Sequence, residues 1–147
     1  MTTIAYRNGC IAADSASFAG WSRNGTCRKI ARNAAGDLAG VCGSATYMGE
    51  FLRWFEGNED GPPPEARVDD GCTDCALIIR RDGRATQFEK GGSFSLSGDW
   101  FALGSGGPEA RGAMHAGADA PRAVMAGIDL DAFSAGPIAF LFASDAP

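Results

Sequence analysis

Clustered positive charge and long apolar runs are what the sequence most clearly lacks. Its 147 residues carry a net charge of -5, and lysine and arginine are nowhere concentrated. Nucleic acids and anionic membranes are bound through such concentrations, so we expect neither as a partner. No apolar run is long enough to span a bilayer, and no apolar segment follows a basic start. We therefore expect a cytoplasmic protein.

Cysteine and histidine give little support for a disulfide framework or a metal site. The five cysteines are an odd number in a chain without a secretion signal, which disfavours a disulfide framework. Cys72 and Cys75 have the spacing of a metal-binding pair, but no second pair exists and His115 is the only histidine. A zinc ion would need carboxylates or another subunit. We expect no metal and no cofactor, and interpret the pair as two loop thiols or a local redox pair.

The content of apolar residues limits how many domains the chain can form. Hydrophobic residues make up 45% of the chain and aromatic residues 10%, enough for one respectable core. Two domains of half this length would each be marginal. We therefore expect residues 1–147 to form a single domain.

The first third of the sequence reads as two hairpins. Residues 3–6 and 10–13 flank Asn8-Gly9, a pair that tolerates the positive φ of a tight turn. Residues 18–26 are rich in Gly, Ser and Asn and indicate a loop, and residues 27–32 and 37–42 indicate a second strand pair. The chain therefore begins inside a sheet, where an end can be held accurately.

The rest of the chain changes from a helical pattern to strands and then to helices again. Apolar residues recur at three- and four-residue spacing from Ser44 to Gly57, which predicts a helix, and the acidic, proline-rich residues 58–70 indicate a loop. Residues 76–80, 85–88, 94–97 and 100–103 predict strands, 108–116 and 121–128 helices, and 138–143 a closing strand. This order is typical of an α+β domain with two packed sheets and helices outside.

The first candidate for chemistry is the Met-Thr start. Removal of Met1 would leave Thr2 with a free amine beside a hydroxyl. A threonine hydroxyl needs a base to take its proton, and an α-amine, with a reference pKa of roughly 7.7–8.0, can do so near neutral pH. The same start occurs in many unrelated proteins, in which Thr2 is an ordinary residue.

Further short motifs support the interpretation of Thr2 as a nucleophile. They are Thr2-Thr3-Ile4, Ala12-Ala13-Asp14-Ser15, Arg28-Lys29-Ile30, residues 39–45, Leu103-Gly104-Ser105-Gly106-Gly107-Pro108 and Asp131-Ala132-Phe133-Ser134-Ala135-Gly136. In order and approximate spacing this series resembles the proteasome β-subunit family, including the bacterial HslV peptidases. The resemblance covers most of the chain except residues 58–75.

The resemblance implies a fold and a set of catalytic residues. The implied fold is a four-layer αββα sandwich of the N-terminal-nucleophile (Ntn) hydrolase type, made of two antiparallel sheets, with the second outer helix shortened or replaced by a loop. Thr2 would be the nucleophile, Lys29 the cation beside it and Asp14 the partner of that cation. Gly43 would supply the oxyanion-hole N–H. The residues around the terminal amine would be Ser105, Asp131 and Ser134.

Substrate contacts are implied in the same way. The backbones of Phe18, Gly43 and Ala45 match positions that pair with an extended peptide. Val41, Ala31 and Gly49 match the neighbourhood of the first specificity pocket, where small and apolar linings would favour a hydrophobic side chain before the cleaved bond. Taken singly, these residues are also typical of ordinary turns, caps and core positions.

The sequence departs from the family in two places that matter. Ala16 stands where proteasome subunits often have a basic residue, so one hydrogen-bonding support is absent. Residues 58–75 replace a long second outer helix, which bears on ring geometry and on ATPase docking.

The functional expectation is a threonine-type endopeptidase inside a homo-oligomeric ring. Its substrate would be unfolded polypeptide, and an ATP-dependent unfoldase of the HslU kind is a candidate partner, since the chain has no ATP-binding motif of its own. Two alternatives stay open. One is a catalytically silent ring-forming homologue, and the other is a small-molecule amidase on the same fold.

Overall fold

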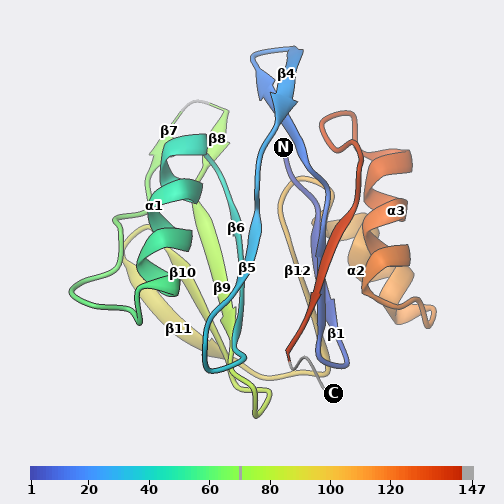
Figure 1. Ribbon diagram of the computed structural model, residues 1–147. Helices are drawn as coiled ribbons and strands as arrows, with labels where there is room; N and C mark the ends of the chain where they lie inside the picture. The colour runs from blue at the N-terminus through green and yellow to red at the C-terminus, as the bar shows by residue number, and fades with distance from the viewer. Residues whose placement is uncertain (70, 144–147) are drawn as a thin grey trace.

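The computed structural model describes residues 1–69 and 71–143. Two antiparallel sheets form its centre (Figure 1). The four-stranded sheet has the order β12-β1-β2-β13, with strands Trp100–Leu103, Ile4–Arg7, Cys10–Ala13 and Ala139–Phe142. The five-stranded sheet has the order β11-β10-β9-β6-β5, with strands Gly92–Leu96, Ala85–Glu89, Cys75–Ile79, Leu38–Cys42 and Ile30–Arg32.

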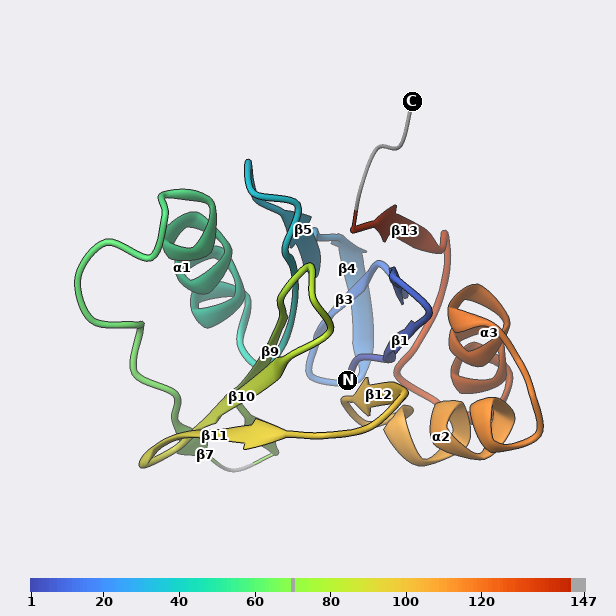
Figure 2. The same cartoon turned by 90° about the horizontal axis from the view of Figure 1, so that it is seen from below.

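Three helices cover the outer faces of these sheets. Helix α1 (Ala45–Glu56) lies against the five-stranded sheet, and α2 (Gly107–His115) and α3 (Ala120–Leu130) lie together on the far side of the four-stranded sheet (Figures 1 and 2). Ser44 caps α1 by accepting a hydrogen bond from the Tyr47 N–H. None of these described helices is long and apolar enough to cross a bilayer.

Alternating side chains divide the core into three parts. Ile4 of β1 points into the space between the two large sheets, where it meets Leu38 and Leu77, whereas Ala5 points outward beneath α2 and α3. The small side chains of Ala5 and Ala12 let these helices approach the sheet closely. A third cluster, built on Phe51, lies between α1 and the five-stranded sheet.

The opening hairpin agrees with its sequence signal. Strands β1 and β2 pair with Ile4 opposite Ala13, and both turn residues adopt positive φ, 51° at Asn8 and 77° at Gly9. Because β12 lies on the other side of β1, the start of the chain is an interior strand of its sheet. Because β1 is hydrogen-bonded to a strand on each side, the residue that directly precedes it has little freedom to move.

The predicted fold class, an Ntn αββα sandwich of two antiparallel sheets, is wrong. The described residues form four separate antiparallel sheets, most of them small, together with three helices. The two extra sheets arise from segments that the sequence indicated as loops. They are hairpin β3–β4 (Ala16–Ala19 and Ser22–Thr26) and hairpin β7–β8 (Val68–Asp69 and Cys72–Thr73). Within each hairpin the two strands pair only with each other.

Candidate active site

Thr2 lies just before β1 and is fixed by the loop that follows β12. Its side chain and backbone are 2% exposed, and its carbonyl oxygen accepts a hydrogen bond from the Gly106 N–H at 3.0 Å. Gly104 has a φ of 92°, and a Cβ there would collide with the same carbonyl oxygen. A glycine is therefore required at residue 104 both for its backbone conformation and for its closeness to Thr2.

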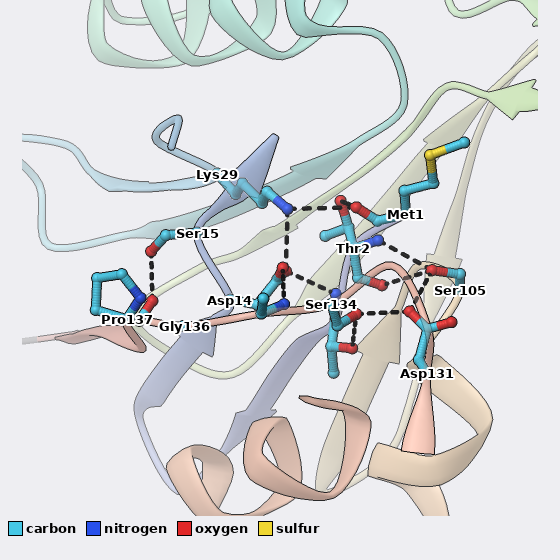
Figure 3. A network of polar contacts seen from close by, with 12 residues as sticks. Met1, Thr2, Asp14, Ser15, Lys29, Ser105, Asp131, Ser134, Gly136 and Pro137 are labelled. Carbon is cyan, nitrogen blue, oxygen red and sulfur yellow. Dashed lines mark hydrogen bonds and ion pairs between the residues drawn. The ribbon is translucent and has the colours of Figure 1, made fainter. Parts of the chain in front are cut away.

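The Thr2 hydroxyl and the Lys29 ammonium donate hydrogen bonds to the same acceptor atom. Thr2 Oγ1 donates a hydrogen bond to the Met1 carbonyl oxygen at 2.7 Å, and Lys29 Nζ donates to that same oxygen at 3.3 Å (Figure 3). The Met1 residue itself is 44% exposed and lines a large cavity. Removal of Met1 would take away the shared acceptor and leave the ammonium facing the hydroxyl.

Lys29 and Asp14 form a fully buried ion pair. The distance from Lys29 Nζ to Asp14 Oδ1 is 3.0 Å, and the two side chains are 1% and 0% exposed. Asp14 also accepts hydrogen bonds from the Thr3 N–H at 2.9 Å and from the Ala135 N–H at 3.2 Å. Buried charges need this degree of pairing, because burial removes the hydration that would otherwise stabilise them. The carboxylate thus holds the ammonium, the start of β1 and residue 135 in one arrangement.

A chain of hydroxyls and one carboxylate surrounds the Thr2 nitrogen. The Thr2 N–H donates to Ser105 Oγ at 3.0 Å, and Ser105 Oγ donates to Asp131 Oδ2 at 2.8 Å. Ser134 Oγ donates to the same Asp131 oxygen at 2.6 Å and lies 2.7 Å from Thr3 Oγ1. Since the Ser134 proton is directed at Asp131, Thr3 is the donor in the last contact. The Thr2–Ser105 contact (Figure 3) and the Thr3–Ser134 contact each join residues that are more than 100 positions apart in the sequence.

Gly43, the expected oxyanion-hole residue, lines the cavity between β6 and α1. Its φ is 122°, and a Cβ at this position would collide with Asp74. Asp74 is 4% exposed and accepts hydrogen bonds from the Ser44 N–H at 2.9 Å and from the Arg67 N–H at 3.0 Å. This carboxylate therefore fixes the turn at residues 43–44 against the segment that precedes β7.

Two further residues fix the turn that carries Ser134. Ser15 Oγ donates to the Pro137 carbonyl oxygen at 2.5 Å, and Arg23 Nη2 donates to the Gly136 carbonyl oxygen at 2.5 Å. Sequence reasoning missed Arg23, which lies on β4 in the segment expected to be a loop. It also missed Asp74, whose only sequence signal was its place between Cys72 and Cys75.

A cavity of about 980 Å³ opens beside Met1, Lys29 and Ser105. Of the expected substrate-binding residues, Phe18 and Ala45 line it together with Gly43. Ala31 and Val41 do not, because both are buried in the cluster between α1 and the five-stranded sheet. Gly49 lies on α1 beside the Arg53 guanidinium, away from this lining. The structure thus places only part of the expected substrate set at the cavity.

Three cysteines lie along the same cavity. Cys42 and Cys75 are directly opposite each other on β6 and β9, and Cys72 is on β8. A hydrogen bond with Cys75 and then burial raise the pKa of Cys42, whereas that hydrogen bond lowers the pKa of Cys75. Residues 1–69 and 71–143 hold no group of three or more His, Cys, Asp or Glu side chains placed to bind a metal ion.

Comparison with known proteins identifies the fold through solved structures. No protein-family model matches the chain, and no curated protein is detectably similar to it in sequence. A structure described as Thiobacillus denitrificans BPH in complex with Epoxomicin matches with a TM-score of 0.68 and 22% identity, over 97% of this chain and 98% of that one. A structure described as Thiobacillus denitrificans BPH matches with a TM-score of 0.67 and 21% identity, over 99% of each chain. The chain therefore shares its fold with Thiobacillus denitrificans BPH.

Proposed function

We propose that this protein is a threonine-type peptidase that uses Thr2 as its nucleophile after Met1 has been removed. The observation that carries the proposal is the meeting of the Thr2 hydroxyl and the buried Lys29 ammonium at a single oxygen atom. A cation held there without solvent favours the form of the threonine oxygen that attacks a carbonyl carbon.

The Thr2 nitrogen itself would be the base. Once Met1 is gone this nitrogen is an amine, and Ser105, backed by Asp131, lies within hydrogen-bonding distance of it. The amine would take the hydroxyl proton as the oxygen attacks, and would give it to the departing peptide amine. The resulting ester would then be hydrolysed by water, with the oxyanion stabilised at the Gly43 N–H in both steps.

The fold comparison gives independent support. Thiobacillus denitrificans BPH, which shares this fold, has been solved with epoxomicin, a proteasome inhibitor. Peptide epoxyketones react with both the hydroxyl and the amine of an N-terminal threonine, so binding of such a compound suits a chain with Thr2 and Lys29 in this arrangement. We accordingly propose a proteasome-like hydrolase, working in the cytoplasm within a homo-oligomeric ring on unfolded polypeptide, with an ATP-dependent unfoldase as a partner.

A catalytically silent homologue is the second candidate, and one observation favours it. With Met1 attached, its carbonyl oxygen satisfies both Thr2 Oγ1 and Lys29 Nζ, and the Thr2 nitrogen is an amide that cannot act as a base. A chain that keeps Met1 would therefore be stable in this arrangement and inactive.

The deciding experiment measures the intact mass of the purified protein before and after incubation with epoxomicin. The peptidase proposal expects loss of Met1 and one adduct, located on Thr2 by peptide mapping. Thr2→Ala, which keeps a free amine without the hydroxyl, should form none, and Thr2→Ser should still react. Loss of Met1 without any adduct would contradict the peptidase proposal. Retention of Met1 without an adduct would favour the catalytically silent homologue. Cleavage of small amides but not of long peptides would favour an amidase.

A further inference from the structure

Two cysteines face each other at the ends of neighbouring strands. Cys42 is the last residue of β6 and Cys75 is the first of β9, and the antiparallel register places them directly opposite each other (Figure 1). Residues opposed in this way have Cα atoms about 4.5–5.5 Å apart, within the roughly 4.4–6.8 Å that disulfides span. Both side chains belong to the cluster between the two large sheets, so they point to the same side. The backbone is therefore already placed for a disulfide.

The two thiols differ in how readily they lose a proton. Cys42 donates a hydrogen bond to the Cys75 sulfur, and this hydrogen bond lowers the pKa of Cys75. The same hydrogen bond, and then burial, raise the pKa of Cys42. Because the thiolate is the form that attacks, Cys75 is the nucleophilic sulfur and Cys42 is the thiol beside it. A readily ionised cysteine next to a second cysteine is the arrangement found in redox-sensing pairs.

The pair is buried, but it can be reached from the cavity of about 980 Å³ beside Met1. Both Cys42 and Cys75 line this cavity, together with Gly43. A cavity of this volume admits a molecule as small as hydrogen peroxide. A folded protein, by contrast, is too large to reach the two sulfurs. The oxidant that fits the site is therefore a small peroxide.

Two other cysteines lack this arrangement. Cys72 lines the same cavity, but it lies opposite Asp69 in its hairpin, and burial raises its pKa. Cys10 lies opposite Arg7 on one side and Phe142 on the other. Neither of them has a cysteine across from it in its sheet. The register thus favours a disulfide between β6 and β9.

We propose that Cys42 and Cys75 form a reversible disulfide when a peroxide enters this cavity, and that the disulfide makes Thr2 less reactive. The Cys75 thiolate attacks one oxygen of hydrogen peroxide, the O–O bond breaks, and a sulfenic acid and hydroxide form. The Cys42 sulfur then displaces the sulfenic oxygen, which leaves as water with the Cys42 thiol proton. The two electrons that reduce the peroxide come from the two sulfurs. A dithiol reductant restores both thiols by exchange.

The disulfide would act on the Gly43 turn. Cys42 directly precedes Gly43, and Cys75 directly follows Asp74. A Cβ on Gly43 would lie 2.7 Å from the Asp74 Cα, so the two backbones already touch. A disulfide holds its sulfurs about 2.0 Å apart, closer than any hydrogen bond, so the strand ends must shift and carry the Gly43 N–H with them. This effect on Thr2 rests on the proposed peptidase function, whereas the chemistry at the two sulfurs does not.

Treatment of the whole protein with hydrogen peroxide tests the pair. Intact mass should show the loss of two hydrogen atoms, and a non-reducing peptide map should join Cys42 to Cys75. Dithiothreitol should reverse both changes. The controls Cys72→Ser and Cys27→Ser should form the same disulfide. A protein that does not react, that gains oxygen atoms at separate cysteines, or that joins Cys72 to another cysteine would overturn the proposal.

Single substitutions test the roles of the two sulfurs. In Cys42→Ala the sulfenic acid at Cys75 has no thiol to displace it, so dimedone should label Cys75. In Cys75→Ala the remaining Cys42 thiol should be labelled severalfold more slowly. Equal labelling in the two variants would contradict the assignment of Cys75 as the nucleophile.

The rate of epoxomicin adduct formation tests the effect on Thr2. Oxidation of the wild type should slow it by at least about tenfold, because a displacement of about 1 Å can cost about 10²-fold, and dithiothreitol should restore it. Cys42→Ala should have the same rate before and after peroxide. A mapped disulfide with an unchanged adduct rate would contradict the effect on Thr2. A mapped disulfide in a protein that forms no adduct even when reduced would contradict the peptidase proposal and leave the thiol chemistry standing.

Discussion

The Thr2 hydroxyl donates its hydrogen bond to the carbonyl oxygen of Met1, at 2.7 Å. The hydroxyl is therefore occupied by the residue whose removal would free it. Lys29 donates to the same oxygen, so one aminopeptidase cut would change the surroundings of the Thr2 hydroxyl, the Lys29 ammonium and the Thr2 nitrogen together.

The buried lysine should matter for both stability and reaction. Lys29→Met leaves the Asp14 carboxylate buried without its cation, which should lower the free energy of unfolding by about 3–5 kcal/mol. Loss of the cation should also slow epoxomicin adduct formation by about 10²-fold or more. Urea unfolding and mass spectrometry measure the two effects.

Lys90→Met is the matched control, because Lys90 is the other lysine of the chain and is exposed. Its stability and adduct rate should equal those of the wild type. The double variant Lys29→Met, Asp14→Asn removes both charges and should regain part of the lost stability without regaining reactivity. Recovery of reactivity in this variant would show that Lys29 acts only through folding.

Ser105→Ala should separate reactivity from stability. Ser105 is exposed, so its loss should change the free energy of unfolding by less than about 1 kcal/mol. Its hydroxyl links the Thr2 nitrogen to Asp131, so peptide cleavage should slow by roughly 10²-fold. Steady-state kinetics measure the second effect, and Ser97→Ala, at another exposed serine, supplies the control. An unchanged rate would remove Ser105 from the proton path.

Gly43→Ala should abolish reactivity. The φ of 122° disfavours any side chain, and the added Cβ would collide with Asp74, so the backbone N–H must move. We expect peptide cleavage to fall by at least about 10²-fold, as for loss of an oxyanion-hole donor. Gly83→Ala, at a positive-φ turn with open space around it, carries a similar strain without the collision. Activity should survive in that control.

Asp37 should give the stability a dependence on acid pH. Burial alone would raise its pKa, but hydrogen bonds from the Arg81 N–H, Asn33 and Arg80 outweigh burial and lower it. A carboxylate with a lowered folded-state pKa stabilises the fold above its unfolded pKa of about 3.9, and this contribution is lost as the pH falls through the folded value.

Asp37→Asn should therefore lower the free energy of unfolding by about 1–3 kcal/mol at pH 7, and by progressively less from pH 4 to pH 2. Urea titrations at several pH values measure the difference between variant and wild type. A difference that stays constant across this range would mean that the ionised carboxylate is not the source of the stability.

Local chemistry predicted the elements that have strong sequence signals of their own. The Asn8-Gly9 turn and the helix expected from Ser44 to Gly57 depend on neighbouring residues, and the structure places them as expected. Hairpins β3–β4 and β7–β8 were missed because their sequences are rich in residues typical of loops and because each is stabilised only by its own partner strand. Those two hairpins account for the difference between the expected sheets and the observed ones.

The candidate site could be predicted only through the resemblance of the sequence to the proteasome β-subunit family. Ser105, Asp131 and Ser134 lie beside the first residues of the chain, yet nothing in their local sequence indicates this. Val41 was expected in the neighbourhood of the first specificity pocket, and the alternation along β6 directs its side chain into the core beneath α1. Asp74 could not be found at all, because its role depends on two backbone N–H groups from distant segments.

The order in which the chain is synthesised bears on the contacts of its first residues. Thr2 and Thr3 leave the ribosome before their partners Ser105 and Ser134, which follow 103 and 131 residues later. Strand β1 likewise waits for β12 before it becomes an interior strand. Domains generally fold as units once their sequence is available, so a nascent chain that still lacks residue 134 has no assembled site. If the protein is the proposed peptidase, it would therefore not cut its neighbours or itself during translation, even if Met1 were removed as soon as it emerged.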